Sequence, residues 1–67
     1  MKINVNNQSR EVQPSVRLSE LMDELLNGSV QGTAVAVNDV LIPRSSQSSY
    51  LLQENDSVLI ITAAQGG

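Results

Sequence analysis

The sequence contains neither cysteine nor histidine, and these two absences remove much of the chemistry that side chains can perform. Without cysteine the chain cannot form a disulfide, a thiolate nucleophile or a cysteine-ligated metal site. Without histidine it lacks the commonest general base and the commonest ligand of transition metals. The aspartates do not compensate, because Asp39 and Asp56 stand in turn signals and not in a calcium-loop pattern. We therefore expect no metal site and no catalytic residue.

Aromatic residues and positive charge are also scarce. Tyr50 is the only aromatic residue, and four Lys and Arg residues stand against seven Asp and Glu, which gives a formal net charge of −3. Nucleic-acid-binding domains need clustered Lys and Arg and usually stacking aromatics, so we expect no nucleic-acid partner. The chain also lacks an apolar run of membrane-spanning length and an apolar segment typical of a secretory signal. We therefore expect a cytoplasmic protein with no membrane partner.

The length of 67 residues suits one small domain, residues 1–67. A chain of this size buries about 60% of the surface that its unfolded state exposes, so its stability is marginal unless the core is closely packed. Because Tyr50 is the only aromatic residue, the core must be built from Ile, Leu, Val, Met and Ala.

The N-terminal residues predict a β-hairpin. Apolar and polar residues alternate over residues 1–5, which is the period of a half-buried strand. Residues 6–8 tolerate the left-handed geometry of a tight turn, and residues 10–13 can return as a second strand. Pro14 has no N–H to donate, so it ends the pairing.

The next segment has the period of an α-helix. Its apolar stripe, at positions i, i+3, i+4, i+7 and i+8, consists of Leu18, Leu21, Met22, Leu25 and Leu26. Arg17, Ser15 and Ser19 are the alternatives for the N-cap, and Asn27-Gly28 is a stop signal. A helix this short is unstable alone, so its stripe must pack on a sheet. Its acidic residues are more typical of a solvated face than of a surface for a basic partner.

The following segment predicts two further strands and a loop. Residues 33–37 and the short run 40–42 form strands on either side of a tight turn at Asn38-Asp39, and Pro43 ends the second strand. The serine-rich stretch 45–49 is expected to be a surface loop or a 3₁₀ turn.

The last part of the chain predicts the central strand of the sheet. Residues 50–52 are expected to pin the serine-rich loop to the core, and Asn55-Asp56 signals a turn. The aliphatic run 58–61 is apolar on both faces, which is typical of a central strand or of a face covered by a partner. The element order is therefore β-β-α-β-β-β. It predicts the α+β class, a roll with a mixed sheet and one main helix packed across it.

This order, followed by Gly66-Gly67, resembles the β-grasp or ubiquitin-like fold. The segment 37–44, Val-Asn-Asp-Val-Leu-Ile-Pro-Arg, and the stretch from Asn55-Asp56 to the two glycines are most similar to the ThiS family, the sulfur carriers of thiamine biosynthesis. The resemblance covers essentially the whole chain. Asn55 departs from the glycine usual before the turn aspartate, but Asn is the next-best residue at positive φ. Arg17 departs from the usual Thr or Ser of the helix cap.

The resemblance implies a carrier and not an enzyme. In this family an ATP-dependent, ThiF-like enzyme adenylates the terminal carboxylate, which is poorly electrophilic on its own at neutral pH. Sulfur then displaces AMP to give a thiocarboxylate, here on Gly67, and a ThiG-like thiazole synthase receives the sulfur. The activating enzyme uses the ATP, so no cofactor is expected on this chain. We expect the free protein to be a monomer.

The resemblance also implies that Gln65, Gly66 and Gly67 form the tail that is threaded into a partner's active site. Six extended residues span at most about 20 Å, and a backbone without Cβ atoms fits a narrow channel. We expect residues 62–67 to be a flexible tail in the free protein, because its last residues have no apolar side chain to bury.

Alternation along the final strand predicts the face that meets a partner. Val58 and Ile60 are β-branched and suit a tightly packed inner face. The residues left on the open face are Leu59, Ile61 and Ala63, with Ala34 and Ala36 as expected neighbours. An exposed aliphatic patch continuous with the tail suits a docking surface. Arg44 is a further candidate for contact with the partner, with pairing to a nearby carboxylate as the equal alternative.

Two other functions remain open from the sequence. One is another β-grasp carrier, such as the small subunit of molybdopterin synthase or a protein modifier. Molybdopterin-type tails often carry prolines before the glycines, whereas residues 62–65 contain none. The other is a β-grasp interaction module that carries nothing. Activation with ATP would separate the carriers from the module, and the sulfur acceptor would separate the two carriers.

Overall fold

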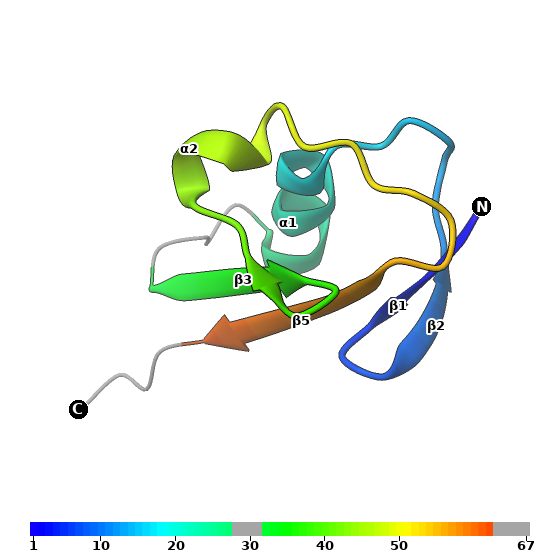
Figure 1. The fold of residues 1–67 in the computed structure, drawn as a ribbon, viewed down its shortest axis with the longest axis horizontal. Coiled ribbons are helices and arrows are strands. Elements are labelled where there is room, and N and C mark those ends of the chain that lie inside the picture. The colour runs from blue at the N-terminus through cyan, green and yellow to red at the C-terminus, as the bar shows by residue number, and fades with distance from the viewer. Residues whose placement is uncertain (28–31, 63–67) are drawn as a thin grey trace.

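A computed structural model describes residues 1–27 and 32–62 of the chain (Figure 1). In these ranges the chain forms five strands, one main helix and one single-turn helix. The elements are β1 (Lys2–Val5), β2 (Gln8–Glu11), α1 (Leu18–Leu26), β3 (Thr33–Val37), β4 (Val40–Leu41), α2 (Arg44–Gln47) and β5 (Ser57–Thr62).

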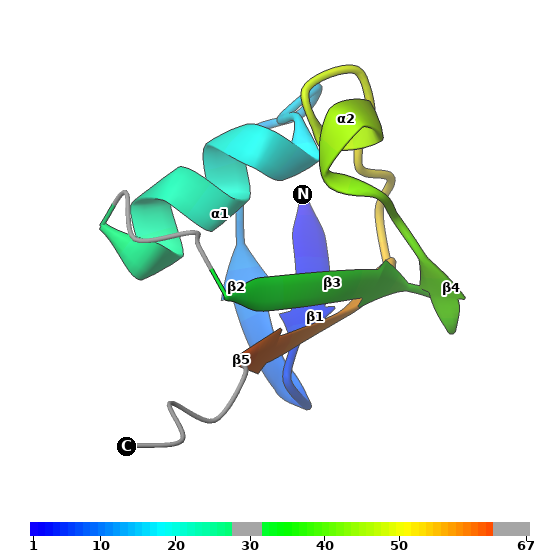
Figure 2. The same ribbon diagram turned by 90° about the vertical axis from the view of Figure 1, so that its left-hand side faces the viewer.

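The strands form one mixed sheet in the order β2-β1-β5-β3-β4. The β1–β5 pair is parallel, and the pairs β1–β2, β3–β4 and β3–β5 are antiparallel. The main helix α1 lies across one face of the sheet, and α2 lies on the same side (Figure 2). The predicted α+β roll is confirmed, and so is the central place of the last strand.

Both hairpins turn through two residues in the left-handed region. Asn6 and Asn7 have φ of 50° and 69°, and Asn38 and Asp39 have φ of 52° and 69°. Asn and Asp tolerate this geometry better than other non-glycine residues, which explains their place in two-residue hairpin loops.

The two-residue turn at positions 6 and 7 corrects the predicted start of the second strand. β2 begins at Gln8, directly after the turn, and not at residue 10. Pairing continues past β2, because the Val12 N–H donates to the Met1 carbonyl at 2.8 Å. Pro14 follows, where the prediction ends the pairing.

The helix α1 has Arg17 as its N-cap residue and Asn27 as its C-cap. The Glu20 carboxylate accepts the Arg17 N–H at 2.7 Å, which is one half of a capping box. Arginine has no acceptor to complete the other half. Asn27 has φ of 55° and donates its N–H to the Asp23 carbonyl, which satisfies an otherwise orphan group at the helix end.

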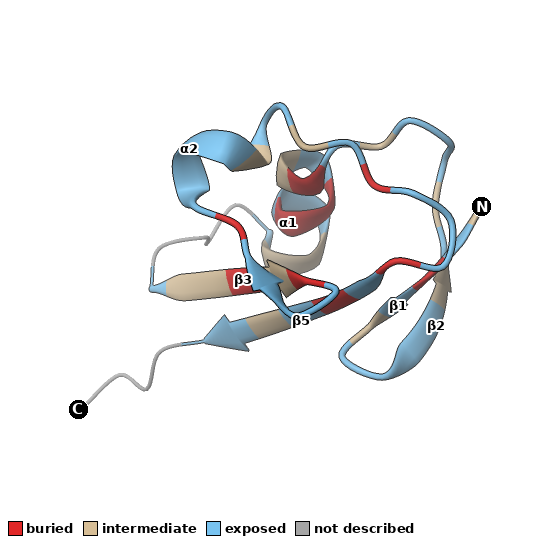
Figure 3. Ribbon diagram, in the orientation of Figure 1, coloured by how far each residue is buried: buried red, intermediate tan, exposed pale blue. Residues whose placement is uncertain are grey.

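The core lies between α1 and the covered face of the sheet (Figure 3). Its buried members from the stripe of α1 are Leu18, Leu21 and Met22, whereas Leu25 and Leu26 are only partly buried. The strands and loops contribute Ile3, Val35, Val37, Ile42, Leu52 and Val58. Because all of these side chains are aliphatic or Met, the core agrees with the composition.

One expectation for the stretch before the last strand is wrong, and another is confirmed only in part. Residues 44–47 form the helical turn α2, where a loop or 3₁₀ turn was expected. Pro43 precedes that turn with an extended backbone (φ −61°, ψ 152°), and its carbonyl accepts the Ser46 N–H at 2.9 Å, which closes the first helical turn. The expectation that residues 50–52 pin the loop to the core is confirmed for Tyr50 and Leu52, which pack on the core. It is wrong for Leu51, which is 47% exposed because it lies between two neighbours that face inward.

Asp56 is a buried carboxylate that fixes the beginning of β5. It is 7% exposed, and its Oδ2 accepts the Gln53 N–H at 2.8 Å. Its Oδ1 accepts Asn38 Nδ2 at 2.9 Å, and the Oδ1 of the same asparagine accepts the Ser57 N–H at 3.0 Å. Asn55 stands just before it with φ of 69°, so the turn predicted at this pair is confirmed.

Within residues 1–27 and 32–62, no group of three or more Asp and Glu side chains is placed to hold a metal ion. The same part of the chain contains no helix that is both long and apolar enough to cross a membrane.

Replacing Asp56 by Ala should lower the free energy of unfolding by about 1–3 kcal/mol, because donors that lose a buried acceptor keep their desolvation cost. Urea denaturation measures the effect. Glu54→Ala is the matched control, since it removes the same charge from an exposed side chain two residues away. Equal unfolding midpoints for the two variants would contradict the assigned role of Asp56.

Candidate functional site

The strand β5 separates its side chains between two faces of the sheet. Val58 is 2% exposed and Ile60 is partly buried against the core. Leu59 and Ile61 are 48% and 49% exposed. The predicted alternation of this strand is therefore confirmed for residues 58–61.

An apolar cluster covers the part of the open face that leads to the end of β5. The register places Ala36 opposite Leu59 and Ala34 opposite Ile61, as expected, and it places Leu41 opposite Ala36. We call Ala34, Ala36, Leu41, Leu59 and Ile61 the open-face cluster. Leu41 was not predicted for this face, although the two-residue turn at Asn38-Asp39 was a signal that could have revealed its pairing with Ala36.

Polar residues bound the open-face cluster on the side of β1. Asn4 and Ser57 are opposite each other there, and Lys2 is opposite Glu11 on the next strand pair. The open face is thus divided into a polar half over β1 and β2 and an apolar half over β5, β3 and β4. A confined apolar patch with a polar border is typical of an interaction surface.

Arg44 does not lie with the open-face cluster. It lines a pocket with Ser19, Met22 and Asp23 of α1. Both α1 and α2, the helical turn that begins at Arg44, lie on the helical side of the sheet (Figure 2). Among residues 1–27 and 32–62, Arg44 forms no ion pair; the ion pair found there joins Arg10 to Glu24 at 2.9 Å. The structure therefore separates Arg44 from Leu59 and Ile61, and its contact with a partner stays a prediction.

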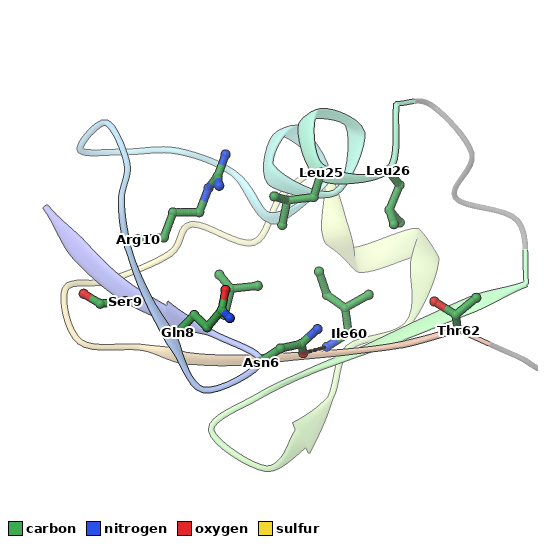
Figure 4. A pocket seen from close by; sticks show the side chains of 9 residues that line it. Asn6, Gln8, Ser9, Arg10, Leu25, Leu26, Ile60 and Thr62 are labelled. Atoms are coloured by element: carbon green, nitrogen blue, oxygen red, sulfur yellow. Dashed lines mark hydrogen bonds between the residues drawn. The ribbon is translucent and has the colours of Figure 1, made fainter.

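Asn6 holds β5 at the point where β1 turns away. Backbone pairing brings the Asn6 N–H to the Val58 carbonyl at 2.9 Å. The side-chain Oδ1 of Asn6 then accepts the Ile60 N–H at 2.8 Å (Figure 4). This contact replaces the backbone acceptor that a longer β1 would have supplied. The sequence gives no signal for it beyond a turn asparagine, because the partner is 54 residues away.

An open pocket of about 300 Å³ lies on the helical side of the sheet beside this contact (Figure 4). Leu25 and Leu26 reach into it from α1, and Ile60 and Thr62 reach into it from β5. The pocket exists because the last turn of α1 covers this end of the sheet only in part. The remaining lining residues are Val5, Asn6, Gln8, Ser9 and Arg10.

The predicted tail lies mostly outside the described residues. Thr62 is the last residue of β5 and is exposed. The described ranges do not include Ala63, Gln65, Gly66 or Gly67. The predicted flexibility of the tail therefore stays a prediction.

The two faces of β5 should respond differently to truncation. Val58→Ala should cost about 1–4 kcal/mol of unfolding free energy, as for other core truncations, whereas Leu59→Ser should cost less than about 1 kcal/mol. Thermal and urea denaturation of both variants measure the difference. A larger loss for the Leu59 variant would show that the open face is packed in solution.

Comparisons with known proteins give a family match for the sequence and, separately, solved structures with the same fold. The chain matches the model of the ThiS family over residues 3–67. It is 27% identical over 67 residues to the sulfur carrier protein ThiS of Escherichia coli (strain K12), and the match covers all of both chains.

Two solved structures share the fold. The crystal structure of the thiamine biosynthesis protein ThiS from Geobacter metallireducens has a TM-score of 0.85 at 22% identity, with all of both chains covered. The solution NMR structure of a thiamine biosynthesis protein from the same organism has a TM-score of 0.80 at 22% identity, and covers this whole chain and 88% of the other. Because the family model extends over nearly the whole chain, this protein belongs to the ThiS family.

Proposed function

We propose that this protein is a sulfur carrier of thiamine biosynthesis that bears the sulfur as a thiocarboxylate on Gly67. The observation that carries the proposal is the family match, which runs to the end of the sequence and includes Gly66 and Gly67. The relative from Escherichia coli, matched over its full length, is named a sulfur carrier protein.

The proposed chemistry needs from this chain only its terminal carboxylate. A carboxylate oxygen attacks the α-phosphorus of ATP, pyrophosphate leaves, and a mixed anhydride with AMP remains. Sulfur at the oxidation level of sulfide then attacks the carbonyl carbon, and AMP leaves with the electrons of the broken C–O bond. The groups that bind ATP and stabilise these steps belong to a ThiF-like activating enzyme. This division of roles fits a sequence without histidine or cysteine.

The thiocarboxylate then serves as the sulfur donor for a ThiG-like thiazole synthase. The same tail has to enter two different active sites, and small residues suit that requirement because they present the backbone without bulky side chains. Gln65 and Gly66 are the residues assigned to this threading.

We assign the docking of both enzymes to the open-face cluster. Leu59 and Ile61 lie on the strand that leads directly into the tail, and about half of each side chain is exposed. A partner that covers them gains apolar burial and sets the distance from its active site to the start of the tail. Arg44 is on the other side of the sheet, so a partner would contact it only by reaching around the β4 edge.

Removing Gly67, or replacing Gly66 by Val, should abolish adenylation, because the first change displaces the carboxylate and the second places a branched side chain in the channel. ATP–pyrophosphate exchange with the cognate activating enzyme measures the step. Mass spectrometry of the wild-type product should show one terminal oxygen replaced by sulfur. Near-normal exchange by the shortened chain would rule out the carrier function.

Leu59→Ser and Ile61→Ser should each weaken binding to the activating enzyme by roughly tenfold, the loss expected when an apolar contact in an interface is removed. Leu51→Ser is the matched control, since Leu51 is 47% exposed but lies outside the open-face cluster. Titration calorimetry compares the three variants. Equal weakening by the control variant would place the docking surface elsewhere.

A further inference from the structure

The edge of β5 that faces β1 is open over its last residues. Successive residues of a strand direct their backbone groups to opposite neighbours. The carbonyls of Asp56 and Val58 accept N–H groups from Asn4 and Asn6, both at 2.9 Å, so the even-numbered residues of β5 face β1. The Ile60 carbonyl and both backbone groups of Thr62 therefore face the same side.

These three backbone groups have no partner within the described ranges. β1 ends at Val5, and its pairing with β5 ends at Val58. The side chain of Asn6 satisfies the Ile60 N–H but leaves the carbonyl of the same residue unpaired. On its other side β5 stays paired with β3 as far as Thr62, which is opposite Thr33. One edge of the strand is thus complete and the other is open.

From this geometry we infer that the activating enzyme adds an extended segment of its own chain to the sheet beside Ile60–Thr62, in line with β1. The inference rests on the proposed function. Backbone N–H and C=O groups of the added segment would bond to the open edge, as in other cases of recognition by strand addition. The segment would take the place that β1 leaves when it turns at Asn6.

The surroundings of the open edge specify which side chains the added segment carries. In a sheet, a residue opposite Ile60 points to the same face as Ile60, here into the pocket formed with Leu25 and Leu26. An aliphatic side chain fits this position. The next residue, opposite Ile61, points to the other face and extends the open-face cluster. The added segment is therefore extended, and it carries apolar side chains at the two successive positions opposite Ile60 and Ile61.

The position of the open edge next to the tail favours the activating enzyme, and not a second copy of this chain, as the source of the added segment. The five residues that follow Thr62 span at most about 17 Å, so an active site that receives Gly67 brings its protein close to this edge. Two copies of the chain, each with a formal charge of −3, would instead repel each other.

Amide hydrogen exchange tests the inference on the intact protein. The Thr62 amide should exchange rapidly in the free protein and at least about tenfold more slowly in the complex with the cognate activating enzyme in the absence of ATP, because a hydrogen bond protects it. The Ile61 amide, which faces β3, is the internal control and should be protected in both states.

Two variants test the same bond by affinity. Thr62→Pro removes the N–H at the open edge, and it should weaken binding of the enzyme roughly two- to tenfold, the value of one hydrogen bond. Thr62→Ala keeps the N–H and measures what the side chain in the pocket contributes, so the loss in Thr62→Pro should exceed the loss in Thr62→Ala by roughly that two- to tenfold factor. A synthetic chain with an ester in place of the amide between Ile61 and Thr62 removes the same donor without the proline ring, and should repeat the loss.

The outcomes separate this inference from the proposed function. Unchanged exchange at Thr62 in a complex that still catalyses ATP–pyrophosphate exchange would overturn the added strand and leave the carrier function standing. Failure of the wild-type protein to support pyrophosphate exchange would overturn the carrier function itself. A protected Thr62 amide in the free protein, together with a dimer in sedimentation, would assign the edge to a second copy.

Discussion

The register of β5 depends on hydrogen bonds at its two ends. Hydrophobic patterning alone distinguishes poorly between its faces, because a slip by one residue would exchange Val58 and Ile60 for the equally aliphatic Leu59 and Ile61. The buried Asp56 carboxylate and Asn38 fix the first residue of the strand. Asn6 fixes the strand again at Ile60. These polar contacts decide which aliphatic pair enters the core and which remains on the open face.

This arrangement lets one strand serve stability and presentation together. The inner residues of β5 pack on the core under α1, and the outer residues form the open-face cluster next to the tail. A strand with only one apolar face would have a unique register without polar help, but it would offer no apolar surface to a partner. The buried carboxylate is thus linked to the proposed docking surface through the register that it sets.

Periodicity and turn chemistry were sufficient to predict the order of the strands and the main helix and the helix stripe, since these follow from local sequence. The inner face of β5 was predicted from the β-branched side chains of Val58 and Ile60, because patterning alone did not decide it. Contacts between distant residues were not predictable. Nothing near Asn6 or Asp56 in the sequence specifies Ile60 or Asn38 as a partner. The sequence does not show on which side of the sheet Arg44 lies, because that side depends on how α2 packs. Arg44 was therefore proposed for the docking face.

The position of the Asn6-Asn7 turn limits the pairing of β1 with β5 and leaves the last part of the β5 edge accessible to a partner strand. If β1 were two residues longer, its backbone would satisfy the Ile60 N–H directly and would bond to the carbonyl beyond it, so the asparagine side chain would be unnecessary. A strand four residues longer would also close the edge of β5 at Thr62 and narrow the pocket that Leu25 and Leu26 line. With the early turn, Asn6 supplies one bond in place of a strand. The sheet stays anchored, and the edge nearest the tail stays open.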